Sequence, residues 1–191
     1  PEVPMGIGGG SAGGRRVRRR SGGRRGEAGL RPTSSRVRLA IFSMLGPGGL
    51  SGFGVLDLYA GTGALGLEAL SRGADSAEFV EQDERRCRDI KEAAIELGFG
   101  DQATVRRGRC ERVTTTLANR YDIVFIDPPY ADDPFSEVIS NLDEADVLNP
   151  DAVIFAEHSA RTELEERYGR LQRTDSRTYG DTAVSTYRLK V

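Results

Sequence analysis

The stretch that decides the fold is Gly54-Val55-Leu56-Asp57-Leu58-Tyr59-Ala60-Gly61-Thr62-Gly63-Ala64-Leu65-Gly66. Residues 54–59 are mostly large apolar side chains, which predicts a buried strand. Glycines then supply the tight turn that joins a strand to a helix, and we predict that helix from Ala64 to Ser71. A strand, a glycine turn and a helix in this order are typical of one unit of a parallel sheet.

The chain after residue 71 repeats this alternation of strand and helix. Strands are predicted at residues 77–81, 103–107, 123–127 and 152–157, and helices at residues 83–97 and 161–168. Residues 171–178 and 183–189 predict an antiparallel pair at the edge of the sheet. The alternation favours an α/β fold of Rossmann-like type, with a mostly parallel sheet and helices on both faces.

The N-terminal residues differ in composition from the rest, which divides the chain into an arm (residues 1–30) and a domain (residues 31–191). Residues 1–38 contain ten arginines and two glutamates, a net charge of +8, whereas the remainder has a net charge of −10. Glycine, arginine and serine dominate the arm, which predicts a flexible segment; a helix should begin at Ser34 or Ser35. The charge separation indicates a nucleic-acid partner for the arm or, alternatively, a solvated basic tail.

Composition also excludes several classes of protein. The 191 residues, 38% of them hydrophobic, suffice for the core of one domain. No apolar stretch approaches the ~20 residues that cross a bilayer, so we expect no membrane contact. Cys87 and Cys110 lack CxxC spacing, and the single histidine argues against a His-based zinc site or a Ser-His-Asp triad. We expect no metal, a cytoplasmic location and a monomer.

In a sheet of this kind, a ligand binds beyond the carboxyl ends of the strands, where the strand order reverses. The glycine turn alone fits a dinucleotide, S-adenosylmethionine or no ligand at all. Asp57 favours S-adenosylmethionine, because a carboxylate repels pyrophosphate but attracts the ammonium of that cofactor. Glu81 ends the second strand and can accept both ribose hydroxyls; the alternative is one more surface acid. The predicted cofactor-binding residues of this region are Asp57, Tyr59, Ala60, Gly61, Thr62, Gly63, Glu81 and Gln82.

The most specific motif of the chain is Asp127-Pro128-Pro129-Tyr130, directly after an apolar strand. Its two prolines restrict the backbone and remove two N–H donors, so the turn presents oxygen acceptors. Asp127 and the Pro128 carbonyl can accept the N–H groups of an exocyclic base amine and stabilise the positive charge that develops on its nitrogen. Tyr130 offers a ring for an extruded base. Against the alternative of an ordinary proline turn, we predict that these four residues are catalytic in methyl transfer to a base amine.

Taken together, these motifs resemble the RsmD family of bacterial 16S ribosomal RNA guanine-N2 methyltransferases. The resemblance rests on residues 31–38, 57–73 and 127–130, in that order, and extends from about residue 7 to residue 182. It implies a class I methyltransferase fold, with a seven-stranded sheet in which one strand is antiparallel. It also implies S-adenosyl-L-methionine as cofactor, S-adenosyl-L-homocysteine as product, and 16S rRNA in the assembling 30S subunit as partner.

The chain departs from the family pattern at a few positions. Ser35 and Leu39 replace an Asp and a Glu, and Arg109-Cys110 stands where an acidic or amide residue often faces the adenine. The Cys110 amide can still bind the adenine, whereas the Arg109 side chain cannot accept a hydrogen bond; we predict both as cofactor contacts. The predicted RNA contacts are Arg15, Arg16, Arg18, Arg19, Arg31, Thr33, Arg36 and Arg38.

Three alternative functions remain open at this stage. A DNA adenine-N6 methyltransferase also uses Asp-Pro-Pro-Tyr, but it usually carries a target-recognition domain that this chain has no room for. An NAD-dependent oxidoreductase fits the glycine turn but not Asp57. A catalytically silent RNA-binding factor on the same scaffold fits the fold, but it would not need the intact motif at residues 127–130.

Overall fold

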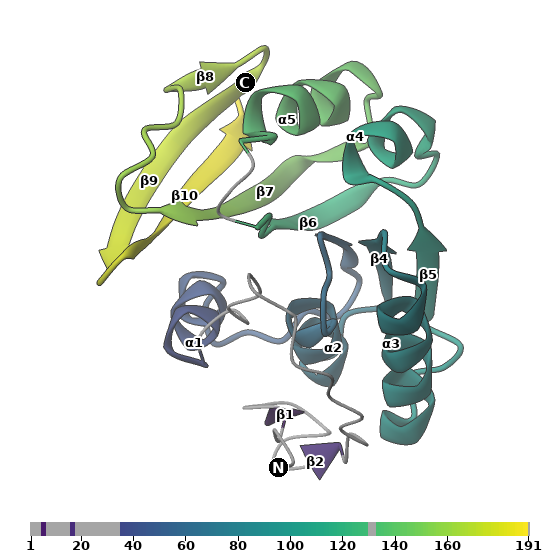
Figure 1. The fold of residues 1–191 in the computed structure, drawn as a ribbon. Helices are drawn as coiled ribbons and strands as arrows, with labels where there is room; N and C mark the ends of the chain where they lie inside the picture. Colours follow the sequence, from purple (N-terminus) through teal and green to yellow (C-terminus); the bar gives the residue numbers. More distant parts are fainter. Residues whose placement is uncertain (1–4, 7–15, 18–34, 130–132, 191) are drawn as a thin grey trace, which may run out of the picture.

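The computed structural model describes residues 5–6, 16–17, 35–129 and 133–190. Its centre is an eight-stranded sheet of order β5-β4-β3-β6-β7-β10-β9-β8 (Figure 1). The strands are β3 (Gly54–Leu58), β4 (Ser76–Glu81), β5 (Ala103–Arg107), β6 (Tyr121–Ile126), β7 (Leu148–Ser159), β8 (Arg167–Tyr168), β9 (Leu171–Tyr179) and β10 (Thr182–Leu189). The first five strands in this order, from β5 through β4, β3 and β6 to β7, are parallel. Strand β10 is antiparallel to both of its neighbours. The predicted mostly parallel sheet is confirmed, and the two-residue β8 adds an eighth strand to the seven expected.

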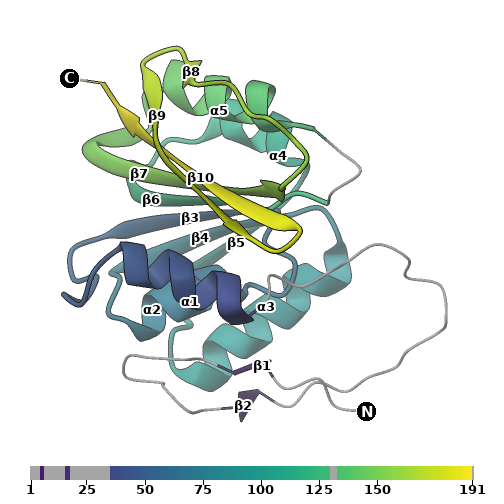
Figure 2. The ribbon, with the colours of Figure 1, turned by 90° about the vertical axis from the view of Figure 1, so that its left-hand side faces the viewer.

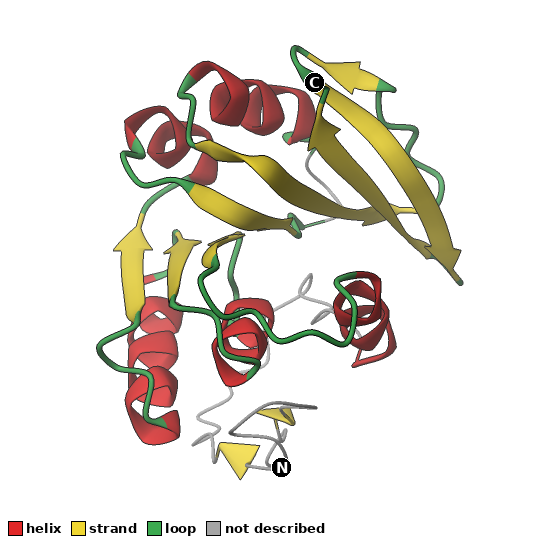
Figure 3. Ribbon diagram, turned by 180° about the vertical axis from the view of Figure 1, so that it is seen from behind, coloured by secondary structure: helices red, strands yellow, loops and turns green. Residues whose placement is uncertain are grey.

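Helices cover both faces of the sheet, as predicted (Figures 1 and 3). One face carries α1 (Ser35–Met44), α2 (Ala64–Ser71) and α3 (Glu84–Leu97); the other carries α4 (Cys110–Val113), the 3₁₀ helix η1 (Thr114–Thr116) and α5 (Phe135–Glu144). Figure 2 shows the sheet between these two layers, with the short antiparallel pair β1 (Met5–Gly6) and β2 (Arg16–Val17) on the side of α3. None of the described helices is long and apolar enough to span a membrane.

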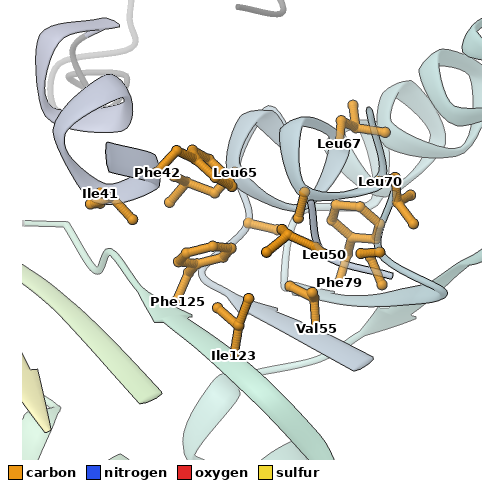
Figure 4. Packing of buried hydrophobic residues seen from close by; sticks show 14 of the residues in the cluster. Ile41, Phe42, Leu50, Val55, Leu65, Leu67, Leu70, Phe79, Ile123 and Phe125 are labelled. Atoms are coloured by element: carbon orange, nitrogen blue, oxygen red, sulfur yellow. The ribbon is translucent and has the colours of Figure 1, made fainter. Parts of the chain in front are cut away.

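Aromatic rings join α1 to the centre of the sheet. Phe125 of β6 lies between Phe42 of α1 and Phe155 of β7, with ring centroids 5.7 Å and 6.0 Å apart, respectively. All three side chains are buried, and Ile41 and Val55 contribute to the same cluster (Figure 4). Because burial of one such side chain stabilises a fold by about 1.5–3 kcal/mol, this cluster holds α1 firmly against the strands that carry the candidate site.

Helix α2 lies at the centre of this layer and buries nearly all of its residues. It lies close to the sheet at Gly66, where an added Cβ would lie 2.3 Å from Cε1 of Phe79 on β4. A larger residue therefore cannot occupy this position unless the helix or the ring moves. This close approach is the physical reason for the third glycine of the GxGxxG motif.

Most predicted elements are confirmed, but the helix expected at residues 161–168 is wrong. This segment is a turn followed by β8, and tertiary contacts satisfy its backbone. The Tyr187 hydroxyl donates to the Glu165 carbonyl over 2.7 Å, and the Arg173 side chain donates to the Leu164 carbonyl over 3.0 Å. Tyr168 packs against Tyr187 at 5.4 Å between ring centroids, which favours an extended backbone here over a helix.

One further element differs from the predictions. Helix α5 was not predicted, although its buried residues Phe135, Val138, Ile139 and Leu142 follow the helical spacing. Helix α3 is confirmed, with Asp83 as its N-cap and Gly98 as a left-handed C-cap. Most of residues 1–30 lie outside the described residues, so the flexibility of the arm stays a prediction.

The variant Gly66→Ala tests the contact between α2 and β4. We expect it to lower the free energy of unfolding by about 1–3 kcal/mol, because the added methyl group overlaps the Phe79 ring. Urea unfolding measures this change. Gly48→Ala is the matched control, since nothing lies within 4 Å of its Cβ position, and Phe79→Leu should restore part of the loss in the double variant. Equal stability of the two alanine variants would contradict this packing.

Candidate active site

The candidate site lies at the carboxyl ends of the central parallel strands. From β3 the chain builds the sheet outward through β4 and β5, then returns to add β6 and β7 on the other side of β3. The strand order therefore reverses between β3 and β6, which is where ligands bind in open α/β sheets. The predicted residues Asp57, Glu81 and Asp127 come from strands that end at this edge.

The turn after β3 has an unusual backbone. Tyr59, Gly61 and Gly63 all have positive φ, of 57°, 55° and 73°. The left-handed region suits glycine but is uncommon for tyrosine. Two hydrogen bonds hold Tyr59 in this conformation: its N–H donates to the Cys110 sulfur over 3.2 Å, and its hydroxyl donates to Glu111 over 2.7 Å. The glycines were predicted from the sequence, but the left-handed tyrosine before them was not.

Asp57 joins this turn to the start of α2. Its side chain is buried, and its Oδ2 accepts a hydrogen bond of 2.9 Å from the N–H of Gly66 in the first turn of the helix. Burial raises the pKa of Asp57 to about 8; the Gly66 N–H opposes the shift, and the charges of Asp127 and Glu81 add to it. Asp57 thus caps a helix, a role that the sequence analysis did not include. Its contact with the ammonium group of a cofactor stays a prediction.

Glu81 holds the glycine turn against the end of β4. Its Oε2 accepts from the Gly61 N–H over 2.8 Å, and its Oε1 accepts from the Asp83 N–H over 2.9 Å. A carboxylate offers about four lone-pair sites, so two of them are available for further donors such as hydroxyls. Glu81 is buried, which argues against a plain surface acid, whereas its neighbour Gln82 is exposed.

The loop after β5 lies beside the same turn. The N–H of Gly108 donates to the Glu81 carbonyl over 3.0 Å, which joins this loop to the end of β4. Cys110 is buried with its sulfur at the Tyr59 amide, and burial raises the pKa of its thiol. Arg109 is exposed and precedes α4. The structure thus brings Arg109-Cys110 next to Tyr59 and Glu81, although their contacts with an adenine stay a prediction.

The Asp127-Pro128-Pro129 turn directly follows β6, the neighbour of β3. Asp127 is partly exposed and Pro128 is buried, while Tyr130 lies outside the described residues. The charge of Asp127 raises the pKa of two acids, Asp57 on one side and Glu157 of β7 on the other. Glu157 was not among the residues predicted from the sequence. The rule that selected Glu81, an acid near the carboxyl end of a strand, could have found it.

The predicted RNA contacts are only partly described. Arg36 of α1 is exposed, but Arg38 has only 9% of its surface exposed, which leaves little of that side chain for RNA. Arg16 belongs to β2, and the remaining predicted contacts, Arg15, Arg18, Arg19, Arg31 and Thr33, lie outside the described residues. RNA binding by this region stays a prediction, as do the absence of a metal, the monomeric state and the cytoplasmic location.

Comparison with known proteins adds to this geometry. A family model described as "Conserved hypothetical protein 95" matches residues 5–188. A relative from Bacillus subtilis, "Putative rRNA methyltransferase YlbH", is 38% identical over 163 residues, which are 84% of this chain and 88% of the relative. The chain belongs to the RsmD family. The resemblance seen in the motifs is thereby confirmed.

Other RsmD-family relatives and solved structures agree with this assignment. The Escherichia coli protein "Ribosomal RNA small subunit methyltransferase D" is 35% identical over 136 residues, 71% of this chain and 68% of that protein. The structure titled "Putative methyltransferase yhhF from Escherichia coli" aligns with a TM-score of 0.84 and 27% identity, covering 98% of this chain and 99% of that one. The Haemophilus influenzae structure titled "putative methylase HI0767" aligns with a TM-score of 0.79 and 26% identity. The alignment covers 98% of this chain and 100% of that one.

Glu81→Gln tests whether Glu81 holds the glycine turn after β3. An amide has only one acceptor oxygen, so either the Gly61 or the Asp83 N–H loses its partner. We expect the free energy of unfolding to fall by about 1–3 kcal/mol, measured by urea denaturation. Glu84→Gln is the control, because Glu84 is exposed and pairs with Arg107, which is exposed too. The loss of stability in this variant should stay within about 0.5 kcal/mol. Equal effects would show that Glu81 does not hold the turn.

Proposed function

We propose that this protein transfers a methyl group from S-adenosyl-L-methionine to the exocyclic N2 of a guanine in 16S ribosomal RNA. The observation that carries the proposal is the Asp127-Pro128-Pro129 turn at the end of β6, beside a glycine turn that Asp57 and Glu81 hold in place. Family membership supports it, since the relatives with curated names include ribosomal RNA small subunit methyltransferases.

The residues around the glycine turn fit the proposed cofactor. Gly61 and Gly63 adopt positive φ and bring backbone, rather than side chains, to the edge of the turn. Glu81 is fixed by two backbone amides and keeps lone pairs for ribose hydroxyls, while the amide of Cys110 suits the adenine. Asp57 is a buried acid, whose ionised form a nearby ammonium stabilises. When bound, the cofactor supplies an electrophilic methyl group on a sulfonium, and it leaves as S-adenosyl-L-homocysteine.

Asp127 and the Pro128 carbonyl act on the amine of the base. A guanine amine is a weak nucleophile, because its lone pair is delocalised into the ring. Two fixed acceptors for its N–H groups draw the nitrogen towards tetrahedral geometry and aim the lone pair at the methyl carbon. The N–C bond forms as the S–C bond breaks, and the positive charge that develops on nitrogen lies next to the Asp127 carboxylate. The nitrogen then loses one proton to solvent by way of Asp127, which leaves a neutral methylated amine.

The charge distribution supports RNA as the substrate. The net charge of +8 lies in residues 1–38 and the net charge of −10 in the rest of the chain, so phosphate contacts favour the N-terminal part. We propose that the arm binds rRNA of the assembling 30S subunit, and that Arg36 of α1 contributes an exposed cation of the domain. The domain then places its acidic site at the base to be methylated.

Asp127→Ala tests the chemistry. We expect it to lower methyl transfer to unmethylated 30S particles by at least about 100-fold, while the affinity for the cofactor stays nearly unchanged. Transfer of radiolabel followed by nucleoside analysis measures the first quantity, and calorimetry with S-adenosyl-L-homocysteine measures the second. Asp101→Ala, an exposed acid in the loop before β5, removes a charge far from the site and should keep full activity.

Nucleoside analysis also decides between reaction types. N2-methylguanosine in the 16S rRNA supports the proposal, whereas N6-methyladenine in DNA would support a DNA methyltransferase. No transfer to particles, naked RNA or DNA would indicate a silent binding factor. Retained transfer by Asp127→Ala would refute the role assigned to Asp127.

Deletion of residues 1–29 tests the arm. We expect weaker RNA binding and a flatter dependence of log affinity on log salt, with the slope falling by about 0.7 for each lost contact to single-stranded RNA. Fluorescence anisotropy at several salt concentrations measures both quantities. Thermal unfolding serves as a control that the domain is still folded. An unchanged affinity and slope would rule out phosphate contacts by the arm.

A further inference from the structure

Glu157 is a buried acid that the reaction described above does not use. It lies near the carboxyl end of β7 with only 5% of its surface exposed. Its Oε2 is fully buried and has no hydrogen-bond partner among the described residues. A buried polar atom without a partner destabilises the folded protein. Because Glu157 lies at the edge of the candidate site, a donor that arrives with a ligand can satisfy this acceptor.

The register of the sheet places Glu157 beside Asp127. On the parallel strands β6 and β7, Ile126 is opposite Ala156, so Asp127 and Glu157 are the next residues on the two strands. Neighbouring strands are about 4.8 Å apart. Because side chains alternate along a strand, Asp127 and Glu157 are on the same face of the sheet as the buried rings of Phe125 and Phe155. The two acids thus lie side by side at the edge where the base amine is expected.

The neighbour of Glu157 on the next strand, β10, is apolar. On its other side, Val184 of β10 is its partner in register, and this residue is fully buried. Burial, and then the charge of Asp127, raise the pKa of Glu157 to about 8. Near neutral pH, therefore, Glu157 is largely protonated in the free protein.

We propose that Glu157 selects guanine by accepting a hydrogen bond from the ring N1–H of the base. The inference rests on the proposed function, because it uses the base that presents its amine to Asp127. In guanine, the exocyclic N2 is next to a protonated N1, whereas the exocyclic amines of adenine and cytosine are next to an unprotonated ring nitrogen on their pairing edge. An ionised carboxylate beside Asp127 attracts an N–H and repels a lone pair. Glu157 thus loses its proton to water as guanine binds.

Nucleotide binding tests this contact without any methyl transfer. The full chain, saturated with S-adenosyl-L-homocysteine, is titrated with GMP, IMP and AMP and followed by NMR. IMP keeps the N1–H of guanine but lacks the amine, so it reports on Glu157 rather than on Asp127. We expect GMP and IMP to bind about tenfold more tightly than AMP, and this preference to grow from pH 6 to pH 8 as Glu157 ionises.

Glu157→Gln is the matched variant. A glutamine can turn either its oxygen to the N1–H of guanine or its NH₂ to the N1 of adenine, so the preference should fall to within about twofold and lose its pH dependence. Glu163→Gln, which removes an exposed acid, should keep both the nucleotide preference and its pH dependence. No preference in the wild type, no binding of any of the three nucleotides, or an unchanged preference in Glu157→Gln would overturn the inference.

Thermal unfolding shows whether the variant is folded and separates a binding role from a structural one. The pKa of Glu157 is raised above the value of 4.5 for a free glutamate, so its ionisation destabilises the folded state increasingly as the pH rises from about 4.5 to about 8. Glu157→Gln should therefore raise the melting temperature relative to the wild type, and more at pH 8 than at pH 5. A lower melting temperature at both pH values would show a structural role and overturn the inference.

Methyl transfer to 30S particles, measured on the same preparations, distinguishes the two proposals. A wild type that prefers GMP and IMP but makes no N2-methylguanosine would contradict the proposed function and leave the base contact in place. A wild type that makes N2-methylguanosine but shows no nucleotide preference would contradict only the assignment to Glu157.

Discussion

The hydrogen bond from the Gly66 N–H to the Asp57 carboxylate is the constraint on which the site depends. It joins the end of β3 to the first turn of α2, where the backbone N–H groups have no partner within the helix. With both ends held, the turn between them is short enough to need left-handed residues at 59, 61 and 63. That conformation presents the Gly61 N–H to Glu81 and the Tyr59 N–H to Cys110, so the ends of β3, β4 and β5 are joined through one turn.

More acidic side chains lie at the same edge of the sheet than the stability of the core would favour. Asp57, Glu81, Asp127 and Glu157 come from four adjacent strands, and three of them are buried. Burial, and then the repulsion between these acids, raise the pKa values of Asp57 and Glu157 to about 8. Such a cluster costs stability, and active sites commonly keep strain or unfavourable charge of this kind because the ligand relieves it. A cofactor with an ammonium and a sulfonium, and a base that donates N–H groups, are ligands that would do so.

The sequence predicted the central part of the fold because each element there follows a local rule. The apolar runs of β3, β4 and β6, the glycine turn and helix α3 are determined by neighbouring residues. Residues 161–168 did not follow such a rule, because the hydroxyl of Tyr187, more than twenty residues away, stabilises an extended segment there. Helix α5 was not predicted, although its buried residues follow the helical spacing.

By itself, the sequence determined the α/β fold class, the family and the chemical types at the strand ends, since motifs and apolar periods are local properties of the chain. Only the tertiary structure decided how those groups are used. It showed that Asp57 caps a helix, that Arg38 is mostly buried, and that Glu157 lies beside Asp127 with an oxygen that no described residue satisfies. The physical reason is that burial, hydrogen-bond partners and the spacing between charges depend on strand order and register, which bring together residues that are far apart along the chain.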